Sequence, residues 1–574
     1  MSYIENYNRW LASDKVDEQT KAELIAIKDN DDEIKLRFYQ SLQFGTAGLR
    51  GTMNAGTNAM NMFTVCQATQ AIATLIKDQR AEDRGVAIAC DSRNNSELFS
   101  KSAAQVLAAN GIKVYIFEDL RPTPVLSFAI RHLNCIAGIN ITASHNPKEY
   151  NGYKAYWEDG AQLPPEHAQT VSDIIAKTDI FDGVLSIPFD DGVKSGIIEI
   201  IGEDVDKAYL ENVYAQAIDL DTVRQMADDI KIVYTPLHGS GYKLVPRVIE
   251  RLGIKNLYMV PEQSTPDGDF PTTPFPNPEY KDVFTPGIAL AKQIGSDLII
   301  ATDPDADRVG IAVKCGDDFV TMTGNQVGAI LLDYIINALK RTGKMPNGAY
   351  TVKSFVTTEL VSKIAKVNNV KMYNVFTGFK YIGEVIKNNE KPGSAEFLFG
   401  FEESYGYLRG TYARDKDAVV GTMLICEVAA YYKKQGMTLY DAMQAIYQKY
   451  GYYRDGVDNL AMKGLDGIDK MKRIMTTLRN DPPKMLADVA VDTVIDYNVP
   501  CRYDMKTGER AVIEGGTTNT VYFKCGDDVI VIRPSGTEPK IKLYYLVNSD
   551  TAQGADDKIE KFKAAALGII NSIE

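Results

Sequence analysis

The chain has 574 residues, of which 45% are hydrophobic and 24% are charged, values close to the globular average. This composition excludes a disordered or fibrous chain, and at roughly 150 residues per domain the length is typical of about four domains. The 63 Lys and Arg against 76 Asp and Glu give a net charge of −13, which argues against a nucleic-acid or anionic-membrane binder. We therefore expect no nucleic acid and no membrane among its partners.

The N-terminal residues and the cysteines indicate a reducing compartment. The start at Met1 lacks the basic and then apolar pattern of a secretory signal, and no apolar run reaches the ~18 residues that a membrane helix needs. The seven cysteines are scattered and none forms a CxxC pair, so neither a zinc site nor a disulfide framework is indicated. We expect buried thiols and a cytoplasmic location.

Along the chain, short apolar runs alternate with helical stretches. Residues 1–40 carry apolar pairs at helical spacing, such as Ile34 and Phe38, and predict a helical cap on the first domain. The later pattern predicts strands at 85–90, 113–117, 230–234, 297–301 and 350–353 and a helix at 97–110. Strands separated by helices predict crossover connections and mostly parallel pairing, which is an α/β fold.

Two further regions differ from this rhythm. Residues 261–280 are rich in Pro, Thr, Asp and Gly and predict an irregular surface segment. After about residue 490 the pattern becomes alternating strands, with a turn at 506–508 and a C-terminal helix from about 555. That change predicts a smaller α+β domain at the end of the chain.

Four polar segments follow strand-like runs, where functional loops of α/β folds lie. The first is Thr142-Ala-Ser-His-Asn-Pro147, which exposes Ser144 on a turn. Taken alone, an ordinary Ser/Asn/Pro turn is the plainer interpretation. A Ser–His hydrolase is disfavoured because the GxSxG elbow of such enzymes is absent from the sequence.

The second segment, Asp303-Pro-Asp-Ala-Asp-Arg308, brings three carboxylates to alternate positions. Such carboxylates can converge on one hard cation, Mg²⁺ or Ca²⁺. An EF-hand is excluded because Arg308 and Lys314 stand where that loop requires Gly and Glu. A surface acidic turn is disfavoured, since strongly apolar runs flank the segment on both sides.

The third and fourth segments carry groups suited to a sugar phosphate. Gly400-Phe-Glu-Glu-Ser404 offers two carboxylates and a hydroxyl to a polyol, although a solvated turn is the default for it alone. The nearby run 412–417 mixes charges, as a solvated face usually does. Arg533-Pro-Ser-Gly-Thr-Glu538 offers a guanidinium, two hydroxyls and backbone N–H groups, a phosphate cradle that is not a P-loop. His238 follows a predicted strand, and the sequence leaves open whether it has a functional role or a structural one within its own loop.

With these four motifs in this order, the chain resembles the α-D-phosphohexomutase superfamily, the phosphoglucomutases and phosphomannomutases, from about residue 40 to the end. Segment 44–51 resembles the family's N-terminal loop, and segments 235–241 and 400–407 are similar to the long bacterial α-phosphoglucomutases and the phosphopentomutase-like branch. The resemblance implies four domains around a central cleft, three related α/β/α units with mixed sheets and a smaller C-terminal α+β domain. The expected domains are 1–200 with the catalytic serine, 201–313 with the metal site, 314–455 with the sugar site and 456–574 with the phosphate site.

The resemblance also implies roles for single residues. Ser144 is expected to be the phosphoserine and to bind Mg²⁺ together with Asp303, Asp305 and Asp307. Lys380 is expected to assist proton transfer, with Arg50 and His145 as helpers near the reacting phosphoryl group. The residues expected to bind the substrate are Arg308, Thr377, Gly378, Glu402, Ser404, Arg414, Arg533, Ser535, Gly536 and Thr537.

The implied enzyme is an isomerase that interconverts glucose 1-phosphate and glucose 6-phosphate through a phosphoserine and glucose 1,6-bisphosphate. One Mg²⁺ per chain, the bisphosphate as activator, and a monomer or homodimer are expected. A phosphopentomutase or phosphomannomutase of the same mechanism is the alternative. A Mg²⁺-dependent sugar phosphatase is disfavoured because it has no use for the Arg533 cradle, and a non-catalytic binder because Ser144 and the three aspartates are intact.

Overall fold

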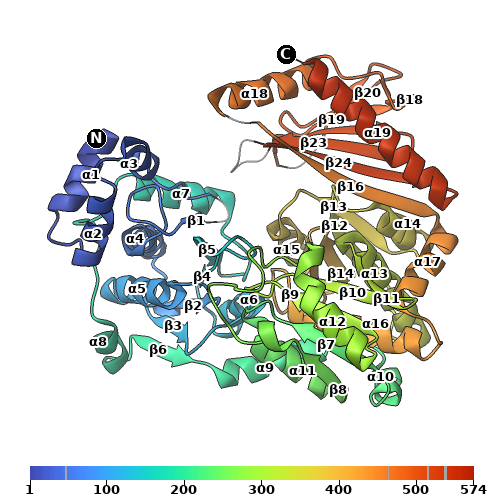
Figure 1. The fold of residues 1–574 in the computed structure, drawn as a ribbon, viewed down its shortest axis with the longest axis horizontal. Coiled ribbons are helices and arrows are strands. Elements are labelled where there is room, and N and C mark those ends of the chain that lie inside the picture. The colour runs from blue at the N-terminus through green and yellow to red at the C-terminus, as the bar shows by residue number, and fades with distance from the viewer. Residues whose placement is uncertain (46–47, 463, 514–515, 535–539, 574) are drawn as a thin grey trace. The chain divides into compact units, whose positions relative to one another are not determined.

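The structure is a computed structural model that describes all residues except 46–47, 463, 514–515, 535–539 and 574 (Figure 1). The chain forms two compact units. The first unit holds residues 1–327, 337–350 and 379–440, and the second holds residues 328–336, 351–378 and 441–574. Each unit has hydrophobic cores of its own.

Three short helices open the first unit: α1 (Tyr3–Ala12), α2 (Glu18–Ala26) and α3 (Asp31–Phe38). They surround Trp10, which is 1% exposed and makes edge contacts with Phe38, Phe63 and Phe181. Because Phe63 lies on α4 (Met62–Asp78), which packs on the first sheet, the helices cover that domain. The helical cap predicted for residues 1–40 is confirmed.

The first sheet is mixed and has the strand order β1-β5-β4-β2-β3-β6. Its strands are β1 (Leu49–Thr52), β2 (Val86–Cys90), β3 (Val114–Phe117), β4 (Ala137–Ile141), β5 (Tyr150–Trp157) and β6 (Ile198–Ile201). The helices of this region after α4 are α5 (Ser96–Ala109), α6 (Thr123–His132), α7 (Pro165–Ile175) and α8 (Phe189–Lys194). Central strands pair in parallel, whereas β5 runs antiparallel to β1 and β4.

The second sheet has the order β11-β10-β9-β7-β8. Its strands are β7 (Lys231–Thr235), β8 (Asn256–Met259), β9 (Leu298–Thr302), β10 (Val309–Cys315) and β11 (Asp318–Met322), with helices α9 (Glu203–Tyr214), α10 (Leu220–Met226), α11 (Gly241–Arg251) and α12 (Thr285–Ile294). Again β7 is parallel to its neighbours and β10 is antiparallel to β9. Segment 261–280 is irregular as predicted, but it is not wholly on the surface, since Phe270 is 1% exposed.

Residues 324–450 again alternate helices and strands. The elements are α13 (Gly324–Arg341), β12 (Ala349–Ser354), α14 (Glu359–Val367), β13 (Lys371–Val375), α15 (Phe379–Asn388), β14 (Glu396–Glu402), β15 (Gly406–Leu408), α16 (Ala418–Lys433) and α17 (Leu439–Tyr450). In the first unit, β14 and β15 form an antiparallel hairpin whose turn carries the third polar segment of the sequence.

The C-terminal region is an antiparallel sheet of order β16-β24-β23-β22-β19-β20-β21 with two helices. Its elements are β16 (Tyr452–Ala461), α18 (Gly464–Asn480), β19 (Thr493–Asp496), β20 (Cys501–Asp504), β21 (Arg510–Val512), β22 (Val521–Cys525), β23 (Asp528–Pro534), β24 (Lys540–Ser549) and α19 (Ala552–Ser572), and a small ribbon is formed by β17 (Met485–Leu486) and β18 (Val489–Ala490). The predicted fold class, α/β/α units with mixed sheets and a C-terminal α+β domain, is confirmed.

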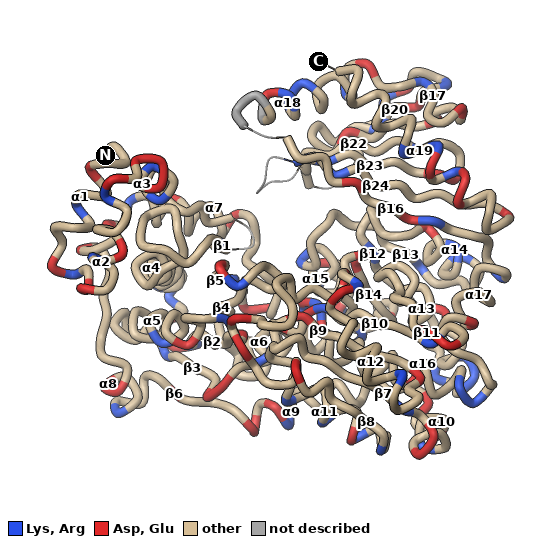
Figure 2. The backbone as a smooth tube through the Cα atoms, viewed as in Figure 1, with Lys and Arg blue, Asp and Glu red and all other residues tan. Residues whose placement is uncertain are grey.

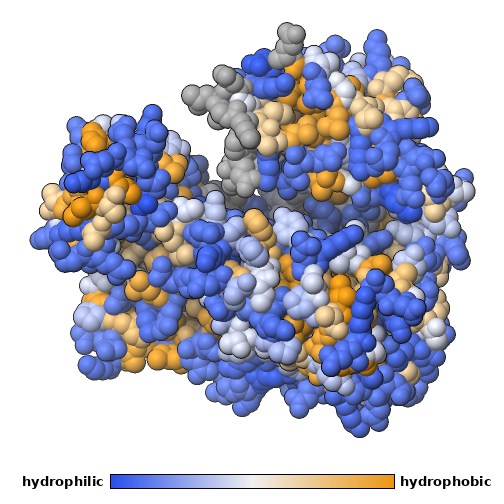
Figure 3. Space-filling view, viewed as in Figure 1, coloured by the Kyte–Doolittle hydropathy of each residue, from blue (hydrophilic) through white to orange (hydrophobic). Residues whose placement is uncertain are grey.

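The charged residues are spread widely over the chain. Figure 2 shows Lys and Arg interspersed with Asp and Glu along the tube, and the face visible in Figure 3 is mostly hydrophilic with scattered hydrophobic residues. Within the part of the chain that the structure describes, no helix combines the length and apolar character needed to cross a bilayer.

Candidate functional site

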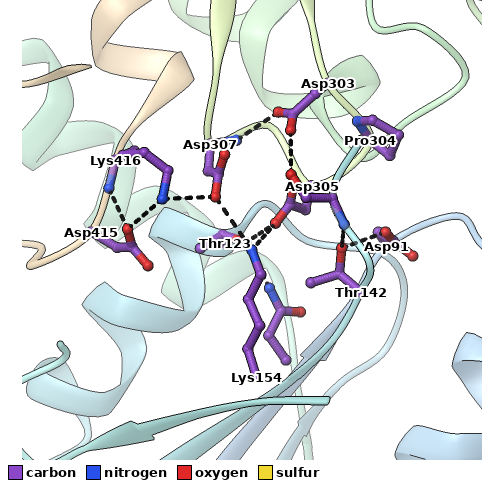
Figure 4. A network of polar contacts seen from close by, with 12 residues as sticks. Asp91, Thr123, Thr142, Lys154, Asp303, Pro304, Asp305, Asp307, Asp415 and Lys416 are labelled. Carbon is purple, nitrogen blue, oxygen red and sulfur yellow. Dashed lines mark hydrogen bonds and ion pairs between the residues drawn. The ribbon is translucent and has the colours of Figure 1, made fainter. Parts of the chain in front are cut away.

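Ser144 lies in the loop that follows β4. It is 3% exposed, and its φ of +51° is in the left-handed region, which a serine keeps only where the surrounding structure holds it. Its backbone N–H donates to Thr142 Oγ1 at 2.8 Å. Thr142 in turn donates to a carboxylate oxygen of the buried Asp91 at 2.6 Å (Figure 4).

The three aspartates of the second motif lie in the loop between β9 and β10. Asp303, Asp305 and Asp307 are buried, and one carboxylate oxygen of each lies within 4.8 Å of the others. Asp303 Oδ1 accepts hydrogen bonds from the backbone N–H of Asp307 at 3.1 Å and of Arg308 at 3.0 Å. Its Oδ2 accepts one from Ser144 Oγ at 2.8 Å, so loops from two sheets meet at one point.

Two buried lysines face these carboxylates (Figure 4). Lys154, on β5, lies 2.6 Å from Asp305 Oδ2 and 3.3 Å from Asp307 Oδ2. Lys416, which precedes α16, lies 3.1 Å from Asp307 Oδ2 and 2.9 Å from Asp415 Oδ1. Burial alone would lower the pKa of Lys154, but the charges of Asp305 and Asp307 raise it, so this ammonium stays protonated.

The carboxylates remain crowded despite these cations. Burial, together with the charges of Asp305 and Asp307, raises the pKa of Asp303 well above its usual range. Burial also acts to raise the pKa of Asp305, but the nearby Lys154 lowers it below its usual value. Among the described residues, Oδ1 of Asp305 and Oδ1 of Asp307 have no hydrogen-bond partner. Buried oxygen ligands of this kind fit a hard divalent cation such as Mg²⁺.

Basic residues surround the serine loop. His145 Nδ1 lies 3.2 Å from Ser144 Oγ, and Arg50 on β1 donates to the Asn146 side chain at 3.1 Å. Burial and the positive charges of Arg308 and Arg50 lower the pKa of His145 well below its usual value, which favours a neutral imidazole. The Arg308 guanidinium donates to Glu279 at 2.7 Å.

The β14–β15 hairpin brings the third motif to the aspartate loop. Glu402, at the end of β14, is 8% exposed, and Ser404 lies half-buried in the turn. Gly406 starts β15, and a Cβ there would lie 2.2 Å from the side chain of Lys416. A glycine is therefore required where Lys416 crosses the hairpin toward Asp307.

The mixed-charge run 412–417 is buried, so its interpretation as a solvated face is wrong. Arg414 is fully buried, and its guanidinium donates to the carbonyls of Thr411 and Ala413 and to Glu390. The Arg414 side chain thus binds its own loop and Glu390, which follows the C-terminal end of α15.

Lys380 lies in the first turn of α15 and is half-buried. Burial lowers the pKa of its ammonium, and the charges of Glu384 and Glu166 oppose that shift. A lowered pKa is what a lysine needs in order to act as a general base near neutral pH.

The remaining motif residues belong to the second unit. Arg533, near the end of β23, donates to Thr377 Oγ1. Gly378 has a φ of +118°, which a residue with a side chain rarely adopts. Ser535, Gly536 and Thr537 lie outside the described residues.

Sequence reasoning missed Lys154, Lys416 and Thr142's partner Asp91. Lys154 lies within a strand and Lys416 within a run of mixed charge, so neither has a local signal of its own. Asp91 follows the strand predicted at 85–90 but stands in none of the four polar segments. Knowledge of the strand pairing would have identified Lys154. In the register of β4 and β5, Lys154 lies opposite Asn140, close to the end of β4 where the loop of Ser144 begins.

Comparison with protein families gives three adjoining matches. Residues 41–180, 207–316 and 323–450 match the phosphoglucomutase/phosphomannomutase alpha/beta/alpha domains I, II and III. A phosphoglucomutase of Staphylococcus saprophyticus is 36% identical over 563 residues, covering 98% of this chain and 98% of that protein. A phosphoglucomutase of Staphylococcus aureus (strain N315) is 35% identical over 539 residues, covering 94% of each chain.

Solved structures share the fold at lower identity. The open form of pp63/parafusin, a phosphoglucomutase from Paramecium, has a TM-score of 0.71 at 18% identity and covers 93% of this chain and 96% of its own. A phosphoglucomutase/phosphomannomutase family protein from Burkholderia thailandensis has a TM-score of 0.65 at 18% identity and covers 92% of this chain and 98% of its own.

Proposed function

Because the chain belongs to the phosphoglucomutase/phosphomannomutase family of mutases, we propose that it interconverts glucose 1-phosphate and glucose 6-phosphate. The observation that carries this proposal is the 2.8 Å contact of Ser144 Oγ with Asp303 in a buried cluster of three aspartates. The similarity over nearly the whole chain to staphylococcal proteins named phosphoglucomutase supports glucose as the sugar.

The family generally uses Mg²⁺, and the aspartate loop has the oxygen atoms to hold it. We propose one Mg²⁺ per chain, held by Asp303, Asp305 and Asp307 together with the phosphate on Ser144. When bound, such a cation offsets the negative charge of a transferring phosphoryl group. Oδ1 of Asp305 and Oδ1 of Asp307, which have no hydrogen-bond partner among the described residues, support this assignment.

The chemistry proposed for the chain's own residues is a double phosphoryl transfer. A sugar hydroxyl attacks phosphorylated Ser144, so the bond from phosphorus to Ser144 Oγ breaks as one to the sugar oxygen forms. The hydroxyl proton passes to Lys380 Nζ, whose pKa is lowered by burial. Ser144 Oγ leaves as an alkoxide. Glucose 1,6-bisphosphate then turns end for end, the Ser144 oxygen attacks its other phosphorus, and the sugar oxygen released from that phosphorus takes the proton from Lys380.

Binding and orientation are assigned to the polar residues around this step. Cationic Arg50, which donates to Asn146 in the serine loop, favours an incoming anion, and His145 lies within hydrogen-bond distance of Ser144 Oγ. The residues proposed to hold the sugar and its second phosphate are Arg308, Thr377, Gly378, Glu402, Ser404, Arg414 and Arg533, with Ser535, Gly536 and Thr537 outside the described chain. The hydrogen bond from Arg533 to Thr377 supports the grouping of those two residues.

The wider setting is also a proposal. The seven cysteines are all free thiols, which supports a reducing compartment and hence the cytoplasm. A monomer or homodimer with glucose 1,6-bisphosphate as activator and sugar phosphates as its small-molecule partners completes the proposal. The four domain ranges given from the sequence stay predictions.

The test is a parallel assay of the purified protein on glucose, mannose and ribose 1-phosphates with Mg²⁺ and the matching bisphosphate. We expect the highest kcat/KM with glucose 1-phosphate and about 80 Da added at Ser144, the mass of one phosphoryl group. Ser144→Ala should abolish turnover, whereas Ser195→Ala, in an exposed turn, should leave it unchanged.

The alternatives are decided by the same experiment. Preference for ribose or mannose phosphate would assign a phosphopentomutase or phosphomannomutase instead. Release of the substrate phosphate as free phosphate would assign a phosphatase. Active protein phosphorylated elsewhere than Ser144, or near-normal turnover of Ser144→Ala, would contradict the proposed nucleophile.

A further inference from the structure

Arg93, which follows β2, is 3% exposed, and its guanidinium binds the loop between β4 and β5 that carries Ser144, the serine loop. It donates to the backbone carbonyls of Ser144, Asn146, Pro147 and Tyr150, with distances of 2.8 Å to Pro147 O and 3.0 Å to Tyr150 O. One planar cation thus holds four carbonyls of a single loop. No other common side chain offers so many donors in one plane, and without Arg93 these carbonyls would lose their shared donor.

Asp91 also fixes the backbone of Ser144, through Thr142 and Arg93. Its carboxylate lies 3.3 Å from Arg93 Nε and accepts hydrogen bonds from the Arg93 backbone N–H at 3.0 Å and from Thr142 at 2.6 Å. Thr142 accepts the N–H of Ser144, while Arg93 binds the carbonyl of Ser144. Both peptide groups of Ser144 are therefore fixed by the Asp91–Arg93 pair, in the conformation whose φ is +51°.

The guanidinium of Arg93 is itself held by the irregular segment of the second sheet's domain. The ring of Phe270 lies 5.0 Å from Arg93 Cζ, a cation–π contact in which both residues are buried. His238 ties this segment down, with its ring nitrogens 3.1 Å from Thr265 O and 2.9 Å from Thr272 Oγ1. His238 therefore stabilises the segment that follows it, and that segment positions Phe270 against Arg93.

We propose that Arg93 is a positioning residue that keeps Ser144 Oγ beside Asp303, and that Phe270 keeps the guanidinium of Arg93 in place. The inference rests on the proposed function, because it presupposes that Ser144 carries the phosphoryl group. Arg93 acts through the backbone of Ser144, so its loss changes the rate of phosphoryl transfer while the groups that bind the sugar phosphate stay. A displacement of a reacting group by about 1 Å can reduce a rate about a hundredfold.

The test compares Arg93→Lys and Phe270→Leu with the wild type in kcat, KM and the rate at which glucose 1,6-bisphosphate phosphorylates Ser144. Arg93→Lys keeps the charge but cannot reach four carbonyls. We expect its kcat and phosphorylation rate to fall about a hundredfold with KM within threefold of the wild type. Phe270→Leu, which keeps an apolar side chain, should lower both rates severalfold with the same KM. Arg409→Lys is the matched control, since this arginine also donates to carbonyls, those of Gln216 and Leu398, but none in the serine loop.

Each outcome decides the inference. A folded Arg93→Lys with wild-type kcat, or one that raises KM alone, overturns it, because positive charge rather than geometry would then be sufficient. If Arg93→Lys does not fold, Phe270→Leu decides: a severalfold loss of phosphorylation rate at constant KM supports the proposal, and wild-type kinetics overturn it. If the wild type itself shows no phosphorylated Ser144, the proposed function fails rather than the geometry of Arg93.

Discussion

Protein side chains balance the charge of the aspartate loop only in part. Lys154 and Lys416 reach Oδ2 of Asp305 and Asp307, while Oδ1 of each has no hydrogen-bond partner in the described chain. Arg308 Nε lies 3.8 Å from Asp307 Oδ1, which is too far for a hydrogen bond. A buried carboxylate oxygen without a hydrogen bond is unfavourable, so the loop is suited to one more cation. At the scale of single residues this imbalance is the strongest support for a metal site.

We expect Asp305→Asn to raise the Mg²⁺ concentration for half-maximal mutase activity by about tenfold to a hundredfold and to lower kcat. The amide keeps the shape of the carboxylate but removes one ligand charge. Titration of Mg²⁺ into chelator-treated enzyme measures the effect. Asp317→Asn, exposed in the turn after β10, should show the wild-type titration. An unchanged Mg²⁺ requirement in Asp305→Asn would remove the loop from consideration as a metal site.

The sequence predicts the site residues that stand together in a motif. It does not predict residues that are distant in the sequence and reach the site only in the folded chain. Asp303, Asp305 and Asp307 are found because alternate carboxylates after an apolar strand are a local pattern. Lys154 reaches the aspartate loop because of the register of β5, and Arg93 contacts Ser144 although it lies 51 residues away in the sequence. No local pattern contains either relation. The roles of the motif residues stay predictions until the variants are measured.

At the scale of elements, the buried strands agree with the sequence to within one or two residues. The runs 85–90 and 297–301 correspond to Val86–Cys90 and Leu298–Thr302, and the helix predicted at 97–110 is Ser96–Ala109. Continuous apolar character marks these elements because both faces of the strands are covered. The antiparallel pairing of β5 and β10 could not be predicted, since it depends on which sheet edge each strand reaches.

One strand of the second unit carries an unusual carboxylate. Asp455 on β16 accepts a hydrogen bond from Thr358, and its Oδ1 has no partner among the described residues. Burial raises the pKa of Asp455 to about 7, although Thr358 and the nearby Lys353 act in the opposite direction, and Glu359 adds to the rise. The folded chain therefore takes up a proton at Asp455 that an unfolded chain, with the usual value of 3.8, has lost.

This raised pKa makes stability depend on pH. Its contribution is fully present below about pH 4 and is lost as pH rises through about 7, because the folded state binds the extra proton in that window. We expect Asp455→Asn to flatten the decline of the unfolding temperature between about pH 4 and pH 7, and to stabilise the chain at pH 8 by about 1–3 kcal/mol. Thermal unfolding at several pH values is the measurement.

The control for this experiment is Asp481→Asn, an exposed acidic residue just after α18. It should leave the pH dependence as in the wild type. If Asp455→Asn shows the same slope as the wild type, the carboxylate is ionised in the folded chain throughout and the assigned shift is wrong.

For the whole molecule, the residues that carry the motifs are divided between the two compact units. Ser144 and the aspartate loop belong to the first unit, and Arg533 with Thr377 to the second. The motif order gives these residues, but it does not tell which segments fold together: residues 351–378 lie in the sequence between two segments of the first unit and yet belong to the second.

Arg533→Ala tests the proposed role of Arg533 in holding the second phosphate. The variant removes the bidentate charge-assisted contact proposed between Arg533 and phosphate, so KM should rise about tenfold to a hundredfold. The bisphosphate should also escape more often and leave Ser144 unphosphorylated, so added glucose 1,6-bisphosphate should restore more activity to the variant than to the wild type. Arg533→Lys should recover only part of the loss, since a point charge lacks the planar fork. Arg510→Ala, exposed on β21 of the same sheet, should keep wild-type KM and the wild-type response to bisphosphate. Wild-type kinetics of Arg533→Ala with both glucose phosphates would place the second phosphate site at other residues.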